Sequence, residues 1–354
     1  MALALYHPQW GYYCSETIAL GKRGDFTTAP EISPLFAYCM AEQSRDIMTT
    51  LGIKQILEIG AGSGRFASDF LTALAKHNQL PAKYYIYEIS ASLREQQRAF
   101  LTETCPQWLH RVKWLTELPQ NLHAIIIANE VLDALPVHCF RINEDEILEK
   151  CVTVENDQFN WQLVPAPAAL NVETNLLLKH HHLPIGYESE INLGLSAFIK
   201  NIAASLTQGV VLFSDYGYGQ PEYYHPERQG GTLTCFYQHH YHREPLLFPG
   251  LQDITAHVDF TRVADDALTH GCTLLGYTSQ AAFLLGCGLL DIAADEEKTL
   301  SEVDQINLHQ AIKILTWPTE MGERVKVMAL GKNISPDIDL TLRGFQLSDR
   351  RRDL

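Results

Sequence analysis

Three glycines at alternate positions follow a short apolar run and precede a segment with helical spacing. The apolar run ends at Ile59, and the helical segment runs from Arg65 to His77. Glycine lets the backbone turn tightly beside a ligand, and the N–H groups at the start of a helix suit a carboxylate or another anion. A plain structural turn after a buried strand is the alternative. The loop residues that we assign to ligand binding are Gly60, Ala61, Gly62 and Gly64.

The spacing of these glycines favours one kind of ligand. In the dinucleotide-binding pattern G-x-G-x-x-G, the third glycine falls three positions after the second, whereas Gly64 falls two positions after Gly62. The shorter spacing favours a methyltransferase that uses S-adenosylmethionine (SAM). Glu58, the acidic residue before the loop, could receive the ammonium group of SAM through bridging contacts. An NAD-dependent oxidoreductase with the same fold is the alternative.

A second carboxylate ends the next apolar run. Residues Tyr84–Tyr87 have the pattern of a strand, and Glu88 follows them, 28 positions after Gly60, which leaves room for one helix and a turn. A carboxylate at this position can accept hydrogen bonds from both ribose hydroxyls of a nucleotide-type ligand. The alternative is a solvated carboxylate at the end of a strand.

Three polar residues follow the third apolar run, Ala124–Ala128. Asn129, Glu130 and Asp133 are predicted to lie at the carboxyl end of a strand, where open α/β sheets bind ligands. Asn129 could face the methyl donor. Glu130 and Asp133 could together orient a cationic nucleophile such as a guanidinium, because paired carboxylates are its natural partners. The alternative is that the two carboxylates cap a helix that follows.

The segments that must position these residues alternate between apolar strands and helices over residues 53–135. This order is typical of a parallel sheet that is covered on both faces. Residues 140–164 alternate between polar and apolar types, as antiparallel strands do, and a helix at 189–206 and a strand at 209–215 are expected next. The sequence therefore predicts an α/β fold: a Rossmann-like methyltransferase sheet with a β-rich insertion and a covering lid.

The predicted organisation has five parts and a helical C-terminal half of the core. Helices are expected near 261–270, 278–288 and 302–316, before a final strand at 324–331. The five parts are an N-terminal segment over the site (1–50), the SAM-binding core (51–140), an insertion with a helix (141–208), the rest of the core with a lid at 216–260 (209–334), and a tail (335–354).

Composition limits the classes of partner. The formal net charge is -15, so the chain lacks the broad basic field that binds phosphate backbones, and we expect a protein substrate and no nucleic acid. No apolar run approaches about 18 residues, so we expect no membrane span. The 8 cysteines include no C-x-x-C pair, and the histidine tracts at 180–182 and 239–242 lack companion carboxylates, so we expect no metal site. The start of the chain resembles neither a signal nor a transit peptide, which predicts a cytoplasmic location.

Longer motifs run from Leu5 to Gly331, beginning with Gly24–Ser33 (GDFTTAPEIS). Together they resemble the MidA family of SAM-dependent methyltransferases, which includes a mitochondrial complex I assembly factor that acts as a protein arginine methyltransferase. The other matching motifs are Glu58–Gly64, Asn129–Pro136, Ser214–Gly217, Gly231–Leu233, Gln252–Phe260, Met321–Gly322 and Val325–Val327.

The resemblance implies a SAM-binding core with family-specific segments over the acceptor site, and an arginine side chain of a protein as acceptor. Asp215 follows a strand and is expected to support the acceptor side, and His257 could supply a base or an orienting group, unless it is a structural histidine. A homodimer is a further expectation, and a non-catalytic SAM-binding assembly factor is the alternative function. The first motif is expected to line the donor pocket, with a capped turn as the alternative, through Asp25, Thr27, Thr28 and Pro30.

Overall fold

A sheet of eight strands forms the centre of the computed structural model, which describes residues 1–15 and 27–354. The strand order is β14-β15-β9-β4-β1-β2-β3, and β13 pairs with the end of β9. Neighbours run parallel, except that β15 is antiparallel to both β9 and β14. The strands are β1 (Gln55–Ile59), β2 (Lys83–Tyr87), β3 (Val112–Leu115), β4 (Leu122–Asn129), β9 (Leu206–Tyr218), β13 (Val258–Asp259), β14 (Cys272–Ser279) and β15 (Val325–Lys332).

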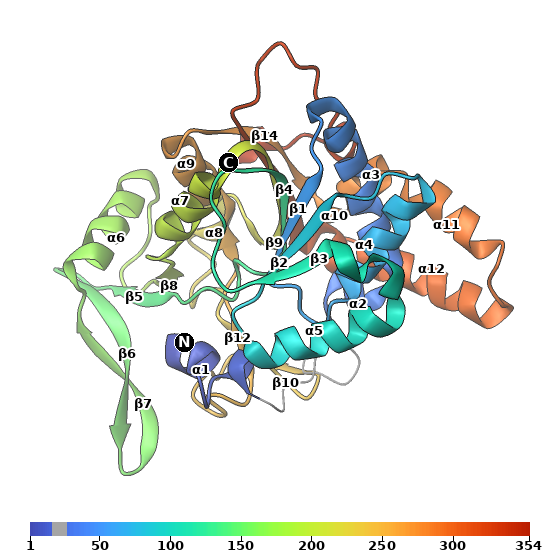
Figure 1. Ribbon diagram of the computed structural model, residues 1–354. Helices are drawn as coiled ribbons and strands as arrows, with labels where there is room; N and C mark the ends of the chain where they lie inside the picture. The colour runs from blue at the N-terminus through green and yellow to red at the C-terminus, as the bar shows by residue number, and fades with distance from the viewer. Residues whose placement is uncertain (16–26) are drawn as a thin grey trace.

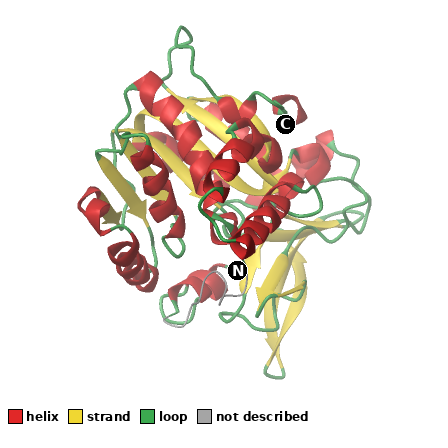
Figure 2. Ribbon diagram, turned by 90° about the vertical axis from the view of Figure 1, so that its right-hand side faces the viewer, coloured by secondary structure: helices red, strands yellow, loops and turns green. Residues whose placement is uncertain are grey.

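Alternate residues of the strands face two separate hydrophobic cores. In β4, Ile125 and Ile127 belong to one core, whereas Ile126 and Ala128 belong to the other. This division follows from the two-residue period of a strand, and burial of both faces explains the continuous apolar run in the sequence. Helices lie on both sides of the sheet (Figures 1 and 2). The first core includes residues of α3 (Pro34–Leu51) and α4 (Arg65–Lys76), and the second those of α7 (Leu195–Ser205) and α9 (Phe260–Thr269).

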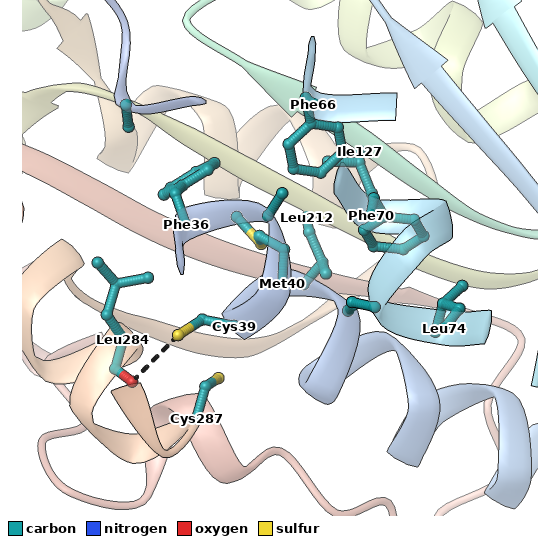
Figure 3. Close-up of a cluster of buried hydrophobic side chains, with 14 of the residues drawn as sticks. Phe36, Cys39, Met40, Phe66, Phe70, Leu74, Ile127, Leu212, Leu284 and Cys287 are labelled. Carbon is teal, nitrogen blue, oxygen red and sulfur yellow. Dashed lines mark hydrogen bonds between the residues drawn. The ribbon is translucent and has the colours of Figure 1, made fainter. Parts of the chain in front are cut away.

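Aromatic side chains of α3 and α4 fill much of the first core. The ring centroids of Phe36 and Phe66 lie 6.1 Å apart, and those of Phe66 and Phe70 lie 5.3 Å apart. Figure 3 shows these rings with Met40 from α3 and Leu212 from β9. This packing fixes the start of α4, and with it the glycine loop that immediately precedes the helix.

The insertion is a second, antiparallel sheet with the strand order β7-β6-β5-β8. The antiparallel strands predicted for residues 140–164 are therefore confirmed, and the hairpin of β6 and β7 extends away from the body of the molecule (Figure 1). The helix predicted at 189–206 is wrong at its start, because residues 188–191 pair with β5 and α7 begins only at Leu195. The elements are β5 (His138–Ile142), β6 (Ile147–Glu155), β7 (Gln158–Pro165), α6 (Ala168–His180) and β8 (Glu188–Ile191).

The long segment 216–260 is more ordered than its composition indicates, because it contains a small antiparallel sheet with the order β11-β10-β12. This sheet packs against the N-terminal helix α1, as Figure 1 shows. Leu5 of α1 is buried in one cluster with Cys235 of β10 and Ile254 of β12. The elements are α1 (Ala2–Tyr6), η1 (Tyr12–Cys14), α8 (Gln220–Tyr223), β10 (Thr234–Tyr237), β11 (His240–His242) and β12 (Asp253–Thr255).

The remaining helices surround the sheet and its C-terminal end. The helices predicted near 261–270, 278–288 and 302–316 are confirmed as α9, α10 and α12. None of the helices in the described part of the chain is both long and apolar enough to cross a bilayer. The other elements are α2 (Ala29–Ile32), α5 (Ala91–Thr104), η3 (Pro106–Arg111), α10 (Gln280–Gly286), α11 (Leu289–Glu297), α12 (Glu302–Thr316), α13 (Met321–Arg324), η4 (Arg343–Phe345) and η5 (Arg351–Asp353).

Candidate active site

A cavity of about 410 Å³ lies at the carboxyl ends of β1, β2 and β4, which is where ligands bind in open α/β sheets. Its walls combine the glycine loop, three strand-end carboxylates and residues of the N-terminal segment. The predicted site residues among those that line it are Thr28, Pro30, Glu58, Gly60, Ala61, Gly62, Glu88, Asn129 and Glu130.

The glycine loop adopts a backbone that side chains disfavour. Gly60, Gly62 and Gly64 have φ angles of 66°, 52° and 85°, all in the left-handed region. A Cβ atom on Gly60 would lie 3.0 Å from Cγ2 of Val131, which also lines the cavity. Gly64 stands outside the cavity wall as the N-cap of α4, so the loop leads directly into the start of that helix.

Glu58 lies deep in the cavity wall at the end of β1. Its side chain is buried, and Oε2 accepts a hydrogen bond of 2.7 Å from the Tyr84 hydroxyl. Burial is the main cause that raises the pKa of Glu58 to about 8; the Tyr84 hydrogen bond opposes the rise, and the nearby charge of Glu88 adds to it. A cationic group bound in the cavity would therefore be a strong electrostatic partner for the ionised form.

Glu88 is held by neighbours on both of its oxygens. Oε1 accepts from the Ser90 N–H at 3.0 Å, and Oε2 accepts from the Gln97 side-chain amide at 3.1 Å. Burial raises the pKa of Glu88, and these two hydrogen bonds oppose that rise. Each carboxylate oxygen keeps accepting capacity toward the cavity that it lines. The structure thus places Glu88 as a buried cavity residue, which excludes the solvated strand-end carboxylate.

Glu130 stands immediately after β4 with an unusual backbone. Its φ angle is 50°, and its N–H donates to the Ser214 carbonyl at 2.8 Å. Oε1 accepts from the Ala29 N–H at 3.2 Å and from the Asn129 amide at 3.1 Å, whereas Oε2 has no hydrogen-bond partner in residues 1–15 and 27–354. Burial, and secondly the charge of Asp215, raise the pKa of Glu130 to about 8.

Asp133 and Asp215 lie behind the cavity wall and not in it. The Asp215 oxygen Oδ2 accepts from the N–H groups of Val131 and Leu132 at 3.0 and 2.8 Å and from that of Asp133 at 3.4 Å, while Oδ1 accepts from the Tyr216 N–H at 2.8 Å. Asp215 therefore holds the turn that carries Glu130. Its position in the sequence indicated a different role, the direct support of the acceptor.

The side chain of Asp133 is buried, and burial together with the carboxylates of Asp215 and Glu130 raises its pKa. The helix-capping alternative for Glu130 and Asp133 is wrong, because a turn follows β4 and the next element is the strand β5. We expected both carboxylates to contact one ligand. Only Glu130 lines the cavity, however, and Asp133 does not.

His257 lies outside this cavity. Its ring packs beside Tyr216 and Tyr218 with centroid distances of 6.3 and 5.2 Å, and it lines a separate cavity of about 40 Å³. Burial, aided by nearby cations of which Arg228 is the strongest, lowers the pKa of His257 to about 4. The ring is therefore neutral near pH 7. Its place fits the structural interpretation better than that of a base beside the donor.

The N-terminal segment covers the cavity with residues that the sequence did not single out. Tyr6 and Tyr13 line it with stacked rings 5.6 Å apart. The Tyr6 hydroxyl donates to the Ala134 carbonyl at 2.8 Å, and the Tyr13 hydroxyl donates to Asp253 at 2.7 Å. The segment 216–260 thus supports this cover from behind and contributes none of the described lining residues.

The predicted GDFTTAPEIS motif meets the glycine loop through α2. Thr28 and Pro30 line the cavity, Thr27 is exposed and does not, and Asp25 lies outside the described residues. Glu31, which the sequence did not single out, accepts a hydrogen bond from the Ser63 hydroxyl. Within the described residues, no group of three or more His, Cys, Asp or Glu side chains is arranged to hold a metal ion.

Comparison with known proteins agrees with this geometry. A family model described as "Putative S-adenosyl-L-methionine-dependent methyltransferase" matches residues 39–278, well over half of the chain. The fold is similar to that of a crystal structure from Burkholderia thailandensis, of a protein described as a "likely methyl transferase" and bound to S-adenosyl-homocysteine. The TM-score is 0.92 and the sequence identity 36%, over 100% of this chain and 90% of that one.

Curated relatives are named by their acceptor. The "Protein arginine methyltransferase NDUFAF7 homolog, mitochondrial" of Drosophila melanogaster is 28% identical over 93% of this chain and 80% of its own length. The "Protein arginine methyltransferase NDUFAF7, mitochondrial" of Rattus norvegicus is also 28% identical, over 93% of this chain and 79% of its own length.

Proposed function

The chain belongs to the MidA-type family of S-adenosylmethionine-dependent methyltransferases, and from this premise we propose that it methylates an arginine side chain of a protein. It is thus a SAM-dependent enzyme with a Rossmann-like fold, and the NAD-dependent alternative is set aside. The arginine acceptor is the proposal. Its support is Oε2 of Glu130, a partly buried carboxylate oxygen with no hydrogen-bond partner within residues 1–15 and 27–354, together with the names of the curated relatives.

The residues around the cavity fit each part of SAM. The backbone N–H groups of the glycine loop suit the carboxylate of the methionine part, and Glu58 suits its ammonium group. Glu88 has accepting capacity for the two ribose hydroxyls. Bound SAM supplies a methyl group on a positively charged sulfur, and the protein's task is to align the acceptor with that group and to exclude water. The tyrosines of the N-terminal cover serve the second purpose.

Glu130 is the residue that we assign to the acceptor. Its Oε1 accepts hydrogen bonds from Ala29 and Asn129, so we assign Oε2 to a ligand in the cavity that Glu130 lines. A guanidinium is the cation that a carboxylate binds best through hydrogen bonds. As the bond from nitrogen to the methyl carbon forms and the carbon–sulfur bond breaks, the guanidinium nitrogen must lose a proton. A carboxylate whose pKa is near 8 accepts that proton more readily than an ordinary one.

The test is to identify the atom that receives the methyl group. The purified enzyme is incubated with an extract of proteins and SAM that carries a deuterated methyl group, and the labelled residue is located by mass spectrometry. We expect enzyme-dependent label on arginine, its loss with Glu130→Gln, and its retention with Glu103→Gln, a matched change at an exposed position on α5. Label on lysine, histidine or a carboxylate would refute the proposed acceptor and leave the donor assignment intact.

A further inference from the structure

The side chain of Gln97 connects the two parts of the cavity wall that we assign to SAM. Gln97 lies on α5 and is fully buried. Its Nε2 amide group donates to the Gly62 carbonyl at 2.9 Å and to Oε2 of Glu88 at 3.1 Å. One amide therefore joins the glycine loop after β1 to the carboxylate after β2, and both partners lie outside the helix that carries Gln97.

The orientation of this amide is determined by its three partners. The indole N–H of Trp114 donates to Oε1 of Gln97 at 3.0 Å. An indole N–H can only donate, while a carbonyl and an ionised carboxylate can only accept, so a flipped amide would lose all three hydrogen bonds. The Arg98 guanidinium lies over the Trp114 ring, 4.9 Å from its centre, and this cation–π contact helps to hold the ring.

We propose that Gln97 is a positioning residue for SAM, which sets both the plane of the Glu88 carboxylate and the distance of the glycine loop from the ligand. The proposal rests on the assignment of Glu88 to the ribose. With Ser90 on one oxygen and Gln97 on the other, the carboxylate can turn in neither direction. Its remaining accepting capacity therefore faces the cavity as a pair, which is what two neighbouring hydroxyl groups require.

The charge balance around Glu88 makes this donor important. Burial raises the pKa of Glu88, and the hydrogen bonds from Ser90 and Gln97 favour its charged form again. Removing the Gln97 donor therefore makes the ionised form of Glu88 less favourable, and it also lets the carboxylate rotate. The other titratable groups that act on Glu88 are Arg94 of α5, Glu58 of β1, Tyr87 of β2, Tyr6 of α1 and Cys14 of η1.

The test measures SAM affinity by calorimetry at pH 6 and pH 8 for two variants. Gln97→Leu removes the three hydrogen bonds with little change of volume, and we expect SAM binding to weaken at least about tenfold at both pH values. Gln97→Glu keeps the acceptor for Trp114 and places a carboxylate against Glu88. At pH 8 the two carboxylates repel and binding should weaken at least about tenfold. At pH 6 the introduced carboxyl takes up a proton, and its single O–H donates to Glu88 but no longer to the Gly62 carbonyl, so affinity relative to wild type should recover in part and exceed that at pH 8 by at least about threefold.

The matched control is Gln96→Glu, the same change at the exposed neighbouring position, which should bind SAM like wild type at both pH values. If Gln97→Leu and Gln97→Glu both bind SAM within about twofold of wild type at pH 8, Gln97 positions nothing and the proposal is wrong. A weakened Gln97→Glu whose affinity relative to wild type is the same at pH 6 and pH 8 indicates general damage to the fold and also overturns it.

A further variant separates this inference from its premise. Glu88→Ala should bind SAM at least about tenfold more weakly, and normal binding would remove the ribose assignment together with the role of Gln97. None of these measurements uses a methyl acceptor, so their failure leaves the arginine proposal standing. In the same way, the absence of labelled arginine in the transfer experiment would leave the Gln97 inference untouched.

Discussion

At the scale of single residues, the unusual feature of the site is a carboxyl group whose ionised form is energetically unfavourable. Glu130 combines a left-handed backbone, burial, and the nearby charge of Asp215. Strained backbone and raised carboxyl pKa values tend to occur where function requires them. We interpret the arrangement as a cost to stability that prepares Oε2 for a cationic acceptor.

This cost predicts a dependence of stability on pH. The pKa of Glu130 is about 8 in the folded protein and has an ordinary value of 4.5, so the folded chain binds the proton more tightly than the unfolded chain does. The stabilisation from the protonated carboxyl is therefore complete below pH 4.5 and is lost as the pH rises through 8. Glutamine stays neutral throughout. In thermal unfolding without SAM, the melting temperature of Glu130→Gln should match that of wild type near pH 5. Toward pH 8 it should rise increasingly above that of wild type. A difference that does not change with pH would contradict this.

At the scale of elements, the turn after β4 is built by a residue from the neighbouring strand. Asp215, near the carboxyl end of β9, accepts hydrogen bonds from three consecutive N–H groups of the turn. The turn carries Glu130 and Val131, and Val131 lies close to Gly60 of the glycine loop. A contact between strands thus helps to set the distance between Glu130 and the glycine loop.

Two alanine variants compare this role with that of a neighbouring buried carboxyl. Asp215→Ala leaves three N–H groups of the turn without an acceptor, and each unsatisfied buried group costs about 1–3 kcal/mol. Asp133→Ala instead removes one member of a group of mutually repelling carboxylates. Measured by thermal unfolding at pH 7.5, Asp215→Ala should have the clearly lower melting temperature. Equal melting temperatures would show that the Asp215 hydrogen bonds do not hold the turn.

At the scale of the whole molecule, two hydrophobic cores on the faces of one sheet bring the carboxyl ends of three strands together. The sequence predicts this part well, because the strands are continuous apolar runs and the glycine spacing is local. It predicts an N-terminal segment over the site, but not the contacts that hold that segment in place. The contact between Tyr6 and the Ala134 carbonyl spans 128 positions, and the one between Tyr13 and Asp253 spans 240. No local pattern of residues records such contacts.

Long-range contacts also decide where two predicted site residues lie. Asp133 and Asp215 follow or lie near strand ends, but both are buried and neither lines the cavity, and the Asp215 carboxylate accepts from backbone N–H groups of the turn. Their predicted roles in catalysis stay predictions. Nothing in the sequence around Gln97 distinguishes it from other residues of an amphipathic helix. Its role comes from its hydrogen bond to Gly62 of the glycine loop, 35 positions away in the sequence. A homodimer and a cytoplasmic location stay predictions, and the curated relatives are named as mitochondrial.

The central claim is that the cavity binds the donor while Glu130 acts on the acceptor. The most direct measurement compares SAM affinity by calorimetry with the single-turnover rate of methyl transfer for wild type, Glu130→Gln and the control Glu103→Gln. We predict that Glu130→Gln binds SAM within about threefold of wild type and transfers the methyl group at least about 100-fold more slowly, while the control is unchanged in both. A transfer rate near that of wild type, or a loss of rate that a loss of SAM affinity fully explains, would contradict the account.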